Sequence, residues 1–404
     1  MTGSIVILRA GWLPTRQANG LQTISMGRAF AKLGFHTTLY YIPSPHVKNE
    51  PLRFDHSKPQ ITLKPLPRAV LPINKAFKLE KLRSLPSFLH AFVWSGIVSR
   101  LTSRSDVDLF FVREPMIAWW LGRRDLLTVL EIHEMPQGQE RMFIRWASQQ
   151  SSVKLVIAVT EHLRSDLEEQ LRVAADKLLT LRNGVDLGDL GCSITKRDAR
   201  QRLGLPLDKP LVVYTGKLSG EKGVDTLIQA APMLNSVGIV IVGGAPAENE
   251  VLHRALQEMD GGHNVTLTGF RSHSDTLLFQ KAADVLALPH STKFVRSKYH
   301  TCPLKLFEYM AAEVPIVASD LPSHREVIRH GENAWLVKPD DPSALAQGIH
   351  TLLEDRTLAQ RLAKQAAMDV QDYTWERRAS EILTRLNLST SGPTDQASCG
   401  VANA

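Results

Sequence analysis

The sequence has 404 residues, which is enough for two domains of ordinary size. Apolar residues make up 43% of it and charged residues 22%, which excludes a fibrous or largely disordered chain. The three cysteines are far apart at Cys192, Cys302 and Cys399, which excludes a disulfide framework and a metal-ligand motif. We therefore expect a globular α/β protein of a reducing cytoplasm.

The net charge of +7 is unevenly distributed along the chain. Residues 1–190 carry 25 Lys and Arg against 17 Asp and Glu, an excess of +8, whereas the remaining residues carry 23 against 24. This asymmetry predicts an anionic partner for the first half, either a phosphate-bearing acceptor or an acidic membrane surface. No nucleic-acid-binding motif is present, so we expect no nucleic-acid partner.

No segment has the pattern of a secretory signal or a membrane-spanning helix. Residues 1–16 lack the long apolar run and the small-residue cleavage site of a signal. No later run approaches the roughly 20 apolar residues that cross a bilayer. We expect any membrane contact to be peripheral, at the inner face of the cell membrane.

The first half predicts a parallel sheet with helices between its strands. An apolar strand at 5–8, a helical stretch at 20–33 and a β-rich run at 36–42 form a β-loop-α-β unit. Three nearly unbroken apolar runs are typical of strands buried on both faces and lie at 108–112, 127–133 and 153–159.

The second half repeats this pattern after an irregular polar linker that follows Asp186 and ends near residue 197. Six strand-like runs with helical periods between them lie at 210–216, 238–244, 264–270, 284–289, 315–320 and 334–339. A helix-like segment over 342–387 precedes a small polar tail that we expect to be disordered. We predict two Rossmann-like, doubly wound parallel-sheet domains over 1–190 and 198–388, and a tail over 389–404. Their ligand cleft is expected at the carboxyl ends of the strands, between the domains.

The segment 215–230 has the strongest local signal for function. A strand ends at Gly216 and a helix starts near Gly223, with Lys217 and Lys222 between them. Two cations and the free N–H groups of a helix start suit a diphosphate, but the spacing differs from a Walker loop and a dinucleotide fingerprint. The alternative is an ordinary loop with two solvated lysines.

A second anion-binding helix start is predicted near residue 303. Pro303 suits the first helical turn, with Leu304 after it, and Thr301 or Cys302 can cap the helix. We expect an anionic ligand, such as the diphosphate of the preceding loop, to contact this turn.

Lys305 and Glu308 lie three residues apart and share one face of the same helix. A carboxylate at that place can accept hydrogen bonds from two vicinal sugar hydroxyls. The alternative for these two residues is a surface ion pair.

The chain resembles the GT-B glycosyltransferases of family 4, or group 1, over most of its length. The resemblance rests on six segments in the same order, which read NGLQTISMGRAFAKLG, EIHEMP, IAVTEHLRSDL, RNGVD, TGKLSGEKGVDTLIQA and CPLKLFEYMAAEVPIVASDLPSHREVI. The resemblance implies a retaining transferase that takes a sugar from a nucleotide diphosphate and needs no metal or other cofactor. It places Lys217 and Lys222 on the diphosphate and Glu308 on the ribose.

Two positions depart from the family's usual residues. Lys217 stands where an Arg is common, which keeps the charge but loses the bidentate fork for phosphate. His300 stands where a Glu that contacts the transferred sugar is common. Tyr299, His300 and the N–H groups near Thr301 are the candidates for that contact.

Five positions of the first half complete the candidate site. His133 follows a strand and corresponds to a family residue beside the donor sugar, so it joins Lys222 and Glu308 as a catalytic candidate; a histidine that merely caps a strand end is the alternative. The loop with Asn19 and Gly20 resembles the family's glycine loop near the diphosphate and acceptor. Arg113 and Glu161 also follow strands and have either binding or structural roles.

The sequence is thus identified as a hexosyltransferase-type enzyme with a nucleotide-sugar donor and a glycan or lipid-linked acceptor. A catalytically silent sugar-nucleotide-binding protein and a sugar-nucleotide epimerase on the same fold are the alternatives. A basic, apolar segment at 68–101 is expected to dock on an anionic membrane in two short pieces broken at Pro72 and Pro86. The alternative is that its apolar residues cover the first sheet.

Overall fold

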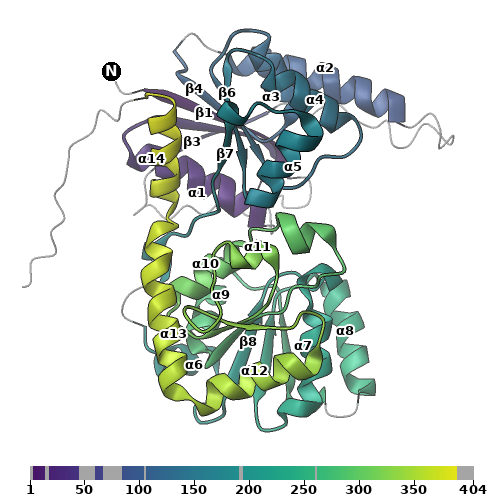
Figure 1. Cartoon of the computed structure of the whole chain (residues 1–404), viewed down its shortest axis with the longest axis vertical. Helices are drawn as coiled ribbons and strands as arrows, with labels where there is room; N and C mark the ends of the chain where they lie inside the picture. Colours follow the sequence, from purple (N-terminus) through teal and green to yellow (C-terminus); the bar gives the residue numbers. More distant parts are fainter. Residues whose placement is uncertain are drawn as a thin grey trace, which may run out of the picture. The chain divides into compact units, whose positions relative to one another are not determined.

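A computed structural model describes residues 3–13, 18–44, 60–66, 84–103, 106–190, 194–259 and 262–388 of the chain. Two sheets organise these residues (Figure 1). The first has seven strands in the order β3-β2-β1-β4-β5-β6-β7, and the second has six in the order β10-β9-β8-β11-β12-β13. Neighbouring strands such as β1 and β4, or β8 and β11, pair in parallel. The protein is therefore an α/β protein with two parallel-sheet domains.

The elements of the first sheet alternate along the chain between strand and helix. They are β1 (Ser4–Leu13), α1 (Ala18–Lys32), β2 (His36–Pro43), β3 (Thr62–Pro65), α2 (Ser84–Thr102), β4 (Leu109–Val112), α3 (Pro115–Gly122), β5 (Thr128–Ile132), α4 (Gln139–Ser148), β6 (Val153–Ala158), α5 (Glu161–Leu171), η3 (Ala175–Lys177) and β7 (Leu178–Thr180). Every residue of β4 and β5 is buried, as their apolar runs predict for the centre of a parallel sheet.

The second sheet continues the alternation. Its first elements are η4 (Leu187–Leu190), α6 (Lys196–Leu203), β8 (Leu211–Thr215), η5 (Gly220–Lys222), α7 (Val224–Ala230), η6 (Ala231–Leu234), β9 (Gly238–Val242), α8 (Pro246–Glu258), η7 (Gly262–Asn264), β10 (Val265–Gly269), α9 (His273–Ala282) and β11 (Val285–Leu288). The remaining elements are the π-helical turn η8 (Arg296–His300), α10 (Leu304–Ala311), β12 (Ile316–Ser319), α11 (Pro322–Arg325), β13 (Trp335–Val337), α12 (Pro342–Glu354), α13 (Arg356–Asp369), η9 (Val370–Asp372) and α14 (Trp375–Arg385).

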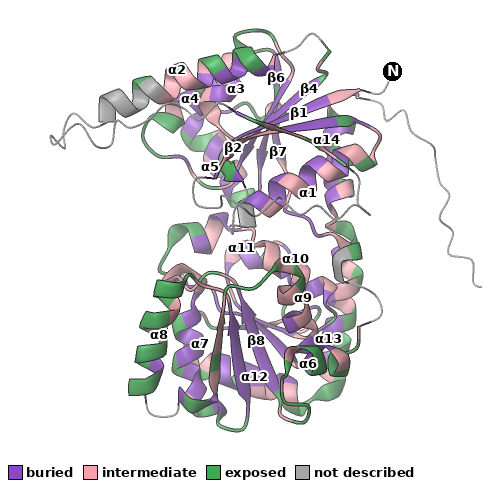
Figure 2. Ribbon diagram, turned by 180° about the vertical axis from the view of Figure 1, so that it is seen from behind, coloured by how far each residue is buried: buried purple, intermediate pink, exposed green. Residues whose placement is uncertain are grey.

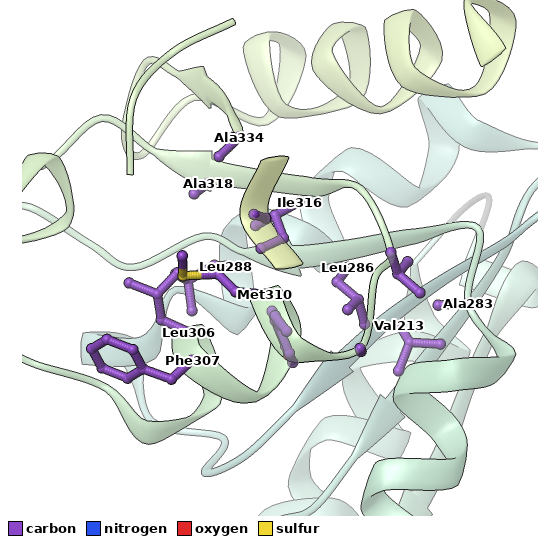
Figure 3. Close-up of a cluster of buried hydrophobic side chains, with 14 of the residues drawn as sticks. Val213, Ala283, Leu286, Leu288, Leu306, Phe307, Met310, Ile316, Ala318 and Ala334 are labelled. Atoms are coloured by element: carbon purple, nitrogen blue, oxygen red, sulfur yellow. The ribbon is translucent and has the colours of Figure 1, made fainter. Parts of the chain in front are cut away.

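Alternate residues of these strands pack on opposite faces of the second sheet. Val213 belongs to a buried cluster with Leu306, Phe307 and Met310 of α10 (Figure 3), whereas its neighbour Tyr214 packs with α7 and α12 on the other face. This follows from the two-residue period of a strand. The apolar face of α10 thereby fixes that helix at the carboxyl end of the sheet.

The expected strands are confirmed, and three expectations about other elements need correction. Strands β3 and β7 were not expected, because β3 is a partly exposed edge strand without an apolar run and β7 has only three residues. The helix-like stretch over 342–387 forms α12, α13 and α14, because Asp355 ends one helix and caps the next. Pro86 does not break its segment, since it lies in the first turn of the single helix α2, where proline is tolerated.

The described residues form two compact units, and the residue boundaries of these units differ from those of the two sheets. The first contains the described residues within 3–131, 138–156 and 376–388, and the second contains those within 132–137 and 157–375. The strands themselves lie within 4–180 and 211–337. The predicted tail over 389–404 lies outside the described residues, and the predicted boundaries near 190 and 198 stay predictions.

A buried ion pair fastens α14 within the first unit. Arg378 Nη1 lies 3.2 Å from Glu131 Oε2, and both side chains are almost fully buried. Gln22 donates from Nε2 to the other carboxylate oxygen of Glu131 at 2.5 Å, and Arg113 donates to Gln22 Oε1 at 2.7 Å. Because an unpaired buried charge is very unfavourable, these partners depend on one another.

We predict that Arg378→Met lowers the free energy of unfolding of the first unit by about 3–5 kcal/mol, because the buried Glu131 carboxylate loses its cation. Urea unfolding followed by tryptophan fluorescence measures the change. Arg385→Met, which removes an exposed partner of Glu381 on the same helix, is the control and is expected to cost less than about 1 kcal/mol. Equal effects of the two substitutions would contradict the role of the buried pair.

Candidate functional site

The loop between β8 and α7 carries the two predicted diphosphate lysines. β8 ends at Thr215, and Gly216 has a φ of 133°, which a residue with a side chain rarely adopts. Lys217 is exposed, and its carbonyl accepts a hydrogen bond from the Tyr214 hydroxyl at 2.5 Å. The strand-loop-helix arrangement predicted from the sequence is therefore confirmed.

This loop is held against the end of β11 by backbone contacts. Glu221 O accepts hydrogen bonds from Ser291 N at 3.2 Å and from Ser297 Oγ at 3.1 Å. Gly223 has a φ of 66°, and a Cβ at this position would lie 1.7 Å from Pro289 O. Only glycine fits there, so the loop has one tightly defined path.

Lys222 is the buried cation of the loop. Its side chain is 18% exposed, and its Nζ lies 3.2 Å from Glu221 Oε1. Burial lowers the pKa of Lys222, and the adjacent Glu221 opposes that effect. An anion entering this loop would find a partly desolvated ammonium group, which binds anions more strongly than a solvated one.

The second predicted anion site lies at the start of α10, but its capping differs from expectation. Pro303 is the N-cap residue, Leu304 is the first helical residue, and no side chain caps the helix. The expectation that Thr301 or Cys302 caps it was therefore wrong. The first-turn N–H groups lack a side-chain cap, which is the arrangement that favours an anion at a helix start.

Asn183 fixes the backbone before this helix. Its N–H donates to Cys302 Sγ at 3.2 Å, and its side-chain Nδ2 donates to Cys302 O at 2.6 Å. The sulfur of Cys302 is therefore an acceptor in a backbone contact.

Glu308 faces the end of the sheet from the second turn of α10. Gln280 of α9 donates from Nε2 to Glu308 Oε2 at 3.0 Å, and His273 Nδ1 lies 3.9 Å from Oε1. Gln280 is fully buried, so it orients the carboxylate rigidly. Lys305 Nζ has no hydrogen-bond partner, so the alternative of a hydrogen-bonded Lys305–Glu308 surface pair is wrong.

Tyr309 joins α10 to the loop that carries the lysines. Its hydroxyl accepts a hydrogen bond from Thr215 N at 2.8 Å and lies 3.1 Å from Thr215 Oγ1. Burial raises the pKa of Tyr309, so the hydroxyl stays protonated. The two predicted anion-binding segments therefore meet at the carboxyl end of β8.

The two candidates for contact with the donor sugar already have protein partners. His300 is buried, and its Nε2 lies 2.7 Å from Asp166 Oδ2. The Tyr299 ring lies 4.9 Å from the His162 ring, and its carbonyl accepts from Thr160 Oγ1. The contact to Asp166 holds the His300 ring and leaves Nδ1 as the atom with which it can meet a ligand.

The remaining candidates are distributed over both units. In the second unit, His133 is half-buried directly after β5, and Glu161 begins α5 with its backbone N–H donating to both carboxylate oxygens of Glu326 at 3.0 Å. In the first unit, Arg113 belongs to the network of Glu131. Asn19 and Gly20 lie in the first turn of α1, which corrects the expectation that they form a loop before it.

Sequence reasoning missed three residues that shape the site. Lys305 had a signal, because it shares a helical face with Glu308, but it was given no role in ligand binding. Gln280 had none, since nothing in α9 marks it as a partner of a carboxylate in α10. Asn183 was quoted only as part of a motif.

Solved structures with the same architecture define the class of fold. Sucrose-phosphate synthase from Thermosynechococcus elongatus superposes with a TM-score of 0.73 at 22% identity, covering 95% of this chain and 98% of that one. The Anabaena protein HepE, in complex with UDP, gives a TM-score of 0.71 at 17% identity, covering 96% and 100%. The fold is that of the GT-B glycosyltransferases.

Family models identify the chain more closely. Residues 195–369 match the glycosyl transferases group 1 and residues 21–189 match glycosyltransferase family 4. These matches together cover most of the chain, and the protein belongs to this group 1, family 4 glycosyltransferase family. A D-inositol 3-phosphate glycosyltransferase from Xylanimonas cellulosilytica is 30% identical over 56% of this chain and 55% of its own length. The chain spans a little over half the length of the curated relatives it matches.

We predict that Lys222→Ala and Glu308→Ala each weaken nucleotide-sugar binding or turnover at least about tenfold, because a charge-assisted contact contributes about 1.5–3 kcal/mol. Titration with a panel of nucleotide sugars measures binding, and the rate of sugar transfer measures turnover. Lys364→Ala and Glu354→Ala, at exposed positions of α13 and α12, are matched controls. Unchanged binding and turnover in both site variants, with folding intact, would contradict the assignment.

Proposed function

We propose that the protein is a retaining glycosyltransferase that moves a sugar from a nucleotide-diphosphate sugar to an acceptor. The observation that supports this best is the meeting of a buried cationic loop, an uncapped helix start and an oriented carboxylate at the end of β8. The loop holds Lys222, and the helix carries Glu308 held by Gln280. Complexes of HepE with UDP and UDP-glucose on the same fold favour such a donor.

Each group has a defined task in this proposal. Lys217 and Lys222 neutralise the diphosphate together with the backbone N–H groups of Thr301 and Leu304, while Pro303, which has no N–H, shapes the donor-binding turn as the N-cap of α10. Glu308 accepts hydrogen bonds from the two ribose hydroxyls. His133 donates to a sugar hydroxyl, and Tyr299 and His300 shape the sugar pocket. Asn19, Gly20, Arg113 and Glu161 are assigned to the acceptor or the diphosphate side.

Retention of configuration fits departure and attack on the same face of the sugar. The bond from the anomeric carbon to the diphosphate oxygen breaks, and a bond from that carbon to the acceptor oxygen forms. The acceptor proton passes to the leaving diphosphate, so charge and atoms balance without an enzymic nucleophile. Lys222 and the start of α10 stabilise the negative charge that grows on the leaving group.

Nucleotide release separates this proposal from its alternatives. The purified protein is incubated with UDP-, GDP- and ADP-sugars, with and without glycan and lipid-linked acceptors. A transferase releases nucleoside diphosphate in an acceptor-dependent manner. An epimerase changes the sugar without release, and a silent binding protein does neither; either of these results would overturn the proposal.

An exposed apolar face on α2 is the observation that best supports a membrane-bound acceptor. Leu89, Val93, Ile97 and Leu101 recur every fourth residue and are 49–59% exposed. Figure 2 shows exposed stretches along α2. The opposite face packs on α3, where Trp120 Nε1 donates to Phe92 O at 3.0 Å. The sequence of α2 has no acidic residue and ends with the exposed Arg100. The alternative that all its apolar residues cover the sheet therefore fails for these four.

We infer that this face and the basic residues before it dock on an anionic membrane, where a lipid-linked acceptor or glycan precursor is reached from the cytoplasmic side. Apolar residues flanked by cations are the pattern of an interfacial helix. Among the described residues, no helix is long and apolar enough to cross a membrane. The expected docking segment 68–101 is described only from Ser84 onward.

We predict that the protein sediments with liposomes, more strongly with anionic lipid and less at high salt. Charge reversal at Lys75, Lys78 and Lys81 should weaken binding by reducing electrostatic attraction to the lipid. The double substitution Val93→Ser with Ile97→Ser should also weaken it, because less apolar area becomes buried in the membrane on docking. Val251→Ser, on the exposed part of α8, is the control. Wild-type protein that stays in the supernatant with acidic liposomes at low salt would mean a soluble acceptor.

We also predict that activity survives a metal chelator, because in the proposed site the lysines and the helix start neutralise the diphosphate without a metal ion. Among the described residues, no group of three or more His, Cys, Asp or Glu side chains is placed to hold a metal ion. Nucleotide release is measured with and without EDTA. Loss of activity that a divalent ion restores would contradict this expectation.

A further inference from the structure

Lys305 is a buried ammonium group without a hydrogen-bond partner. Its Nζ is shielded from solvent and makes no hydrogen bond. It lies 3.9 Å from the centre of the Tyr214 ring, and a cation at a ring face contributes only about 0.5–2 kcal/mol. Taking an ammonium group out of water costs several kcal/mol, so the ring does not compensate for the burial.

The side chain of Lys305 reaches the end of β8 through the space that Gly216 leaves open. α10 packs on one face of the sheet through Leu306 and Phe307, whereas Tyr214 belongs to the opposite face. Lys305 therefore passes the carboxyl end of β8. A Cβ at Gly216 would lie 2.7 Å from Lys305 Nζ and 3.0 Å from its Cε. Gly216 thus opens the path that brings the ammonium under the lysine loop.

The surroundings of Lys305 are rich in positive charge. Lys222 lies near enough to lower the pKa of Lys305, and Glu308 is the acidic group that opposes this effect, but burial is its main cause. His290 and His324 are also buried nearby, and burial together with both lysines lowers the pKa of each ring. Lys305, the largely buried Lys222 and two neutral imidazoles therefore give the end of β8 more positive than negative charge.

The two imidazoles supply no negative charge, because a histidine ring is either neutral or cationic, and burial together with their hydrogen bonds favours the neutral form. His324 Nδ1 donates to Ser319 O at 2.8 Å, so its Nε2 accepts from His290 Nδ1 at 3.0 Å. His290 Nε2 is then an acceptor, and it has no protein partner. Tyr214 and Tyr309, the other titratable groups packed here, have raised pKa values and stay neutral.

We propose that Lys305 is a third donor-binding cation, which supplies positive charge to the diphosphate from beneath the loop 216–222. This rests on the proposed function and adds a residue to its donor site. A lysine that lowers the stability of the empty protein is retained because the bound diphosphate provides its missing counter-charge. The same charge stabilises the leaving diphosphate when the sugar departs.

Proton uptake is the distinguishing consequence. In the empty protein the pKa of Lys305 is depressed, and a bound diphosphate raises it toward its ordinary value. Binding therefore takes up protons between these two pKa values, and affinity falls as pH rises through that window. At pH values above about 8 the phosphates are fully ionised, so their own titration does not contribute.

The test compares Lys305→Met with wild type, using whichever of UDP, GDP and ADP binds wild type. Calorimetry in buffers of different ionisation enthalpy gives both affinity and the number of protons taken up. We expect affinity to fall about tenfold or more, proton uptake to decrease, and the melting temperature without nucleotide to stay equal or rise. Affinity for the nucleoside without phosphates should not change. Lys364→Met is the exposed control, and Lys305→Arg should recover part of the affinity.

Each outcome decides between a ligand role and a structural role. Unchanged affinity and proton uptake in Lys305→Met, with a lower melting temperature, would show that Lys305 only supports the fold and overturn the inference. If Lys305→Met does not fold, Lys305→Gln gives the same comparison with a polar side chain. Should Lys222→Ala lose affinity while Lys305→Met does not, only this inference fails. If wild type binds none of the three nucleotides, the proposed donor site itself fails.

Discussion

The contact between the Tyr309 hydroxyl and Thr215 is the interaction on which the candidate site depends. It connects the second turn of α10 to the last residue of β8, and Leu306, Phe307 and Tyr309 pack in the same buried cluster. The hydrogen bond and this packing together hold the helix in one rotation. Glu308 and Lys305 are therefore presented to the loop after β8 in one orientation, which a binding site for a charged ligand requires.

Charge at the end of β8 is arranged for an anion rather than for stability. The ammonium group of Lys305 is buried and the Lys222 side chain is 18% exposed, and the charge of Lys222 helps to lower the pKa of Lys305. Glu221 and Glu308 compensate only in part, and Glu308 is already engaged by Gln280. Such an excess of buried positive charge is unfavourable in the empty protein and favourable once a diphosphate is bound. Stability and donor affinity are expected to change in opposite directions at these positions.

The first unit combines a rigid interior with an apolar outer helix. Buried Glu131, Gln22 and Arg378 connect β5, α1 and α14, so the scaffold that carries α2 is held by charges that need one another. On α2, by contrast, four apolar side chains face outward and find no cover within the described chain. Rigidity behind an apolar face suits adhesion to a membrane, because little conformational entropy is lost on docking.

The sequence by itself determined all strands except β3 and β7, their parallel arrangement and the positions of Lys217, Lys222 and Glu308, because apolar runs, glycines and strand-end residues act locally. It did not determine which groups meet these residues. Gln280 reaches Glu308 from a different helix, and Lys305 crosses the end of β8 only because Gly216 leaves space. It also could not show that His300 pairs with Asp166. Contacts between distant segments follow from packing, which sequence periodicity does not encode. For Lys305, packing decided that its ammonium group is buried without a hydrogen-bond partner.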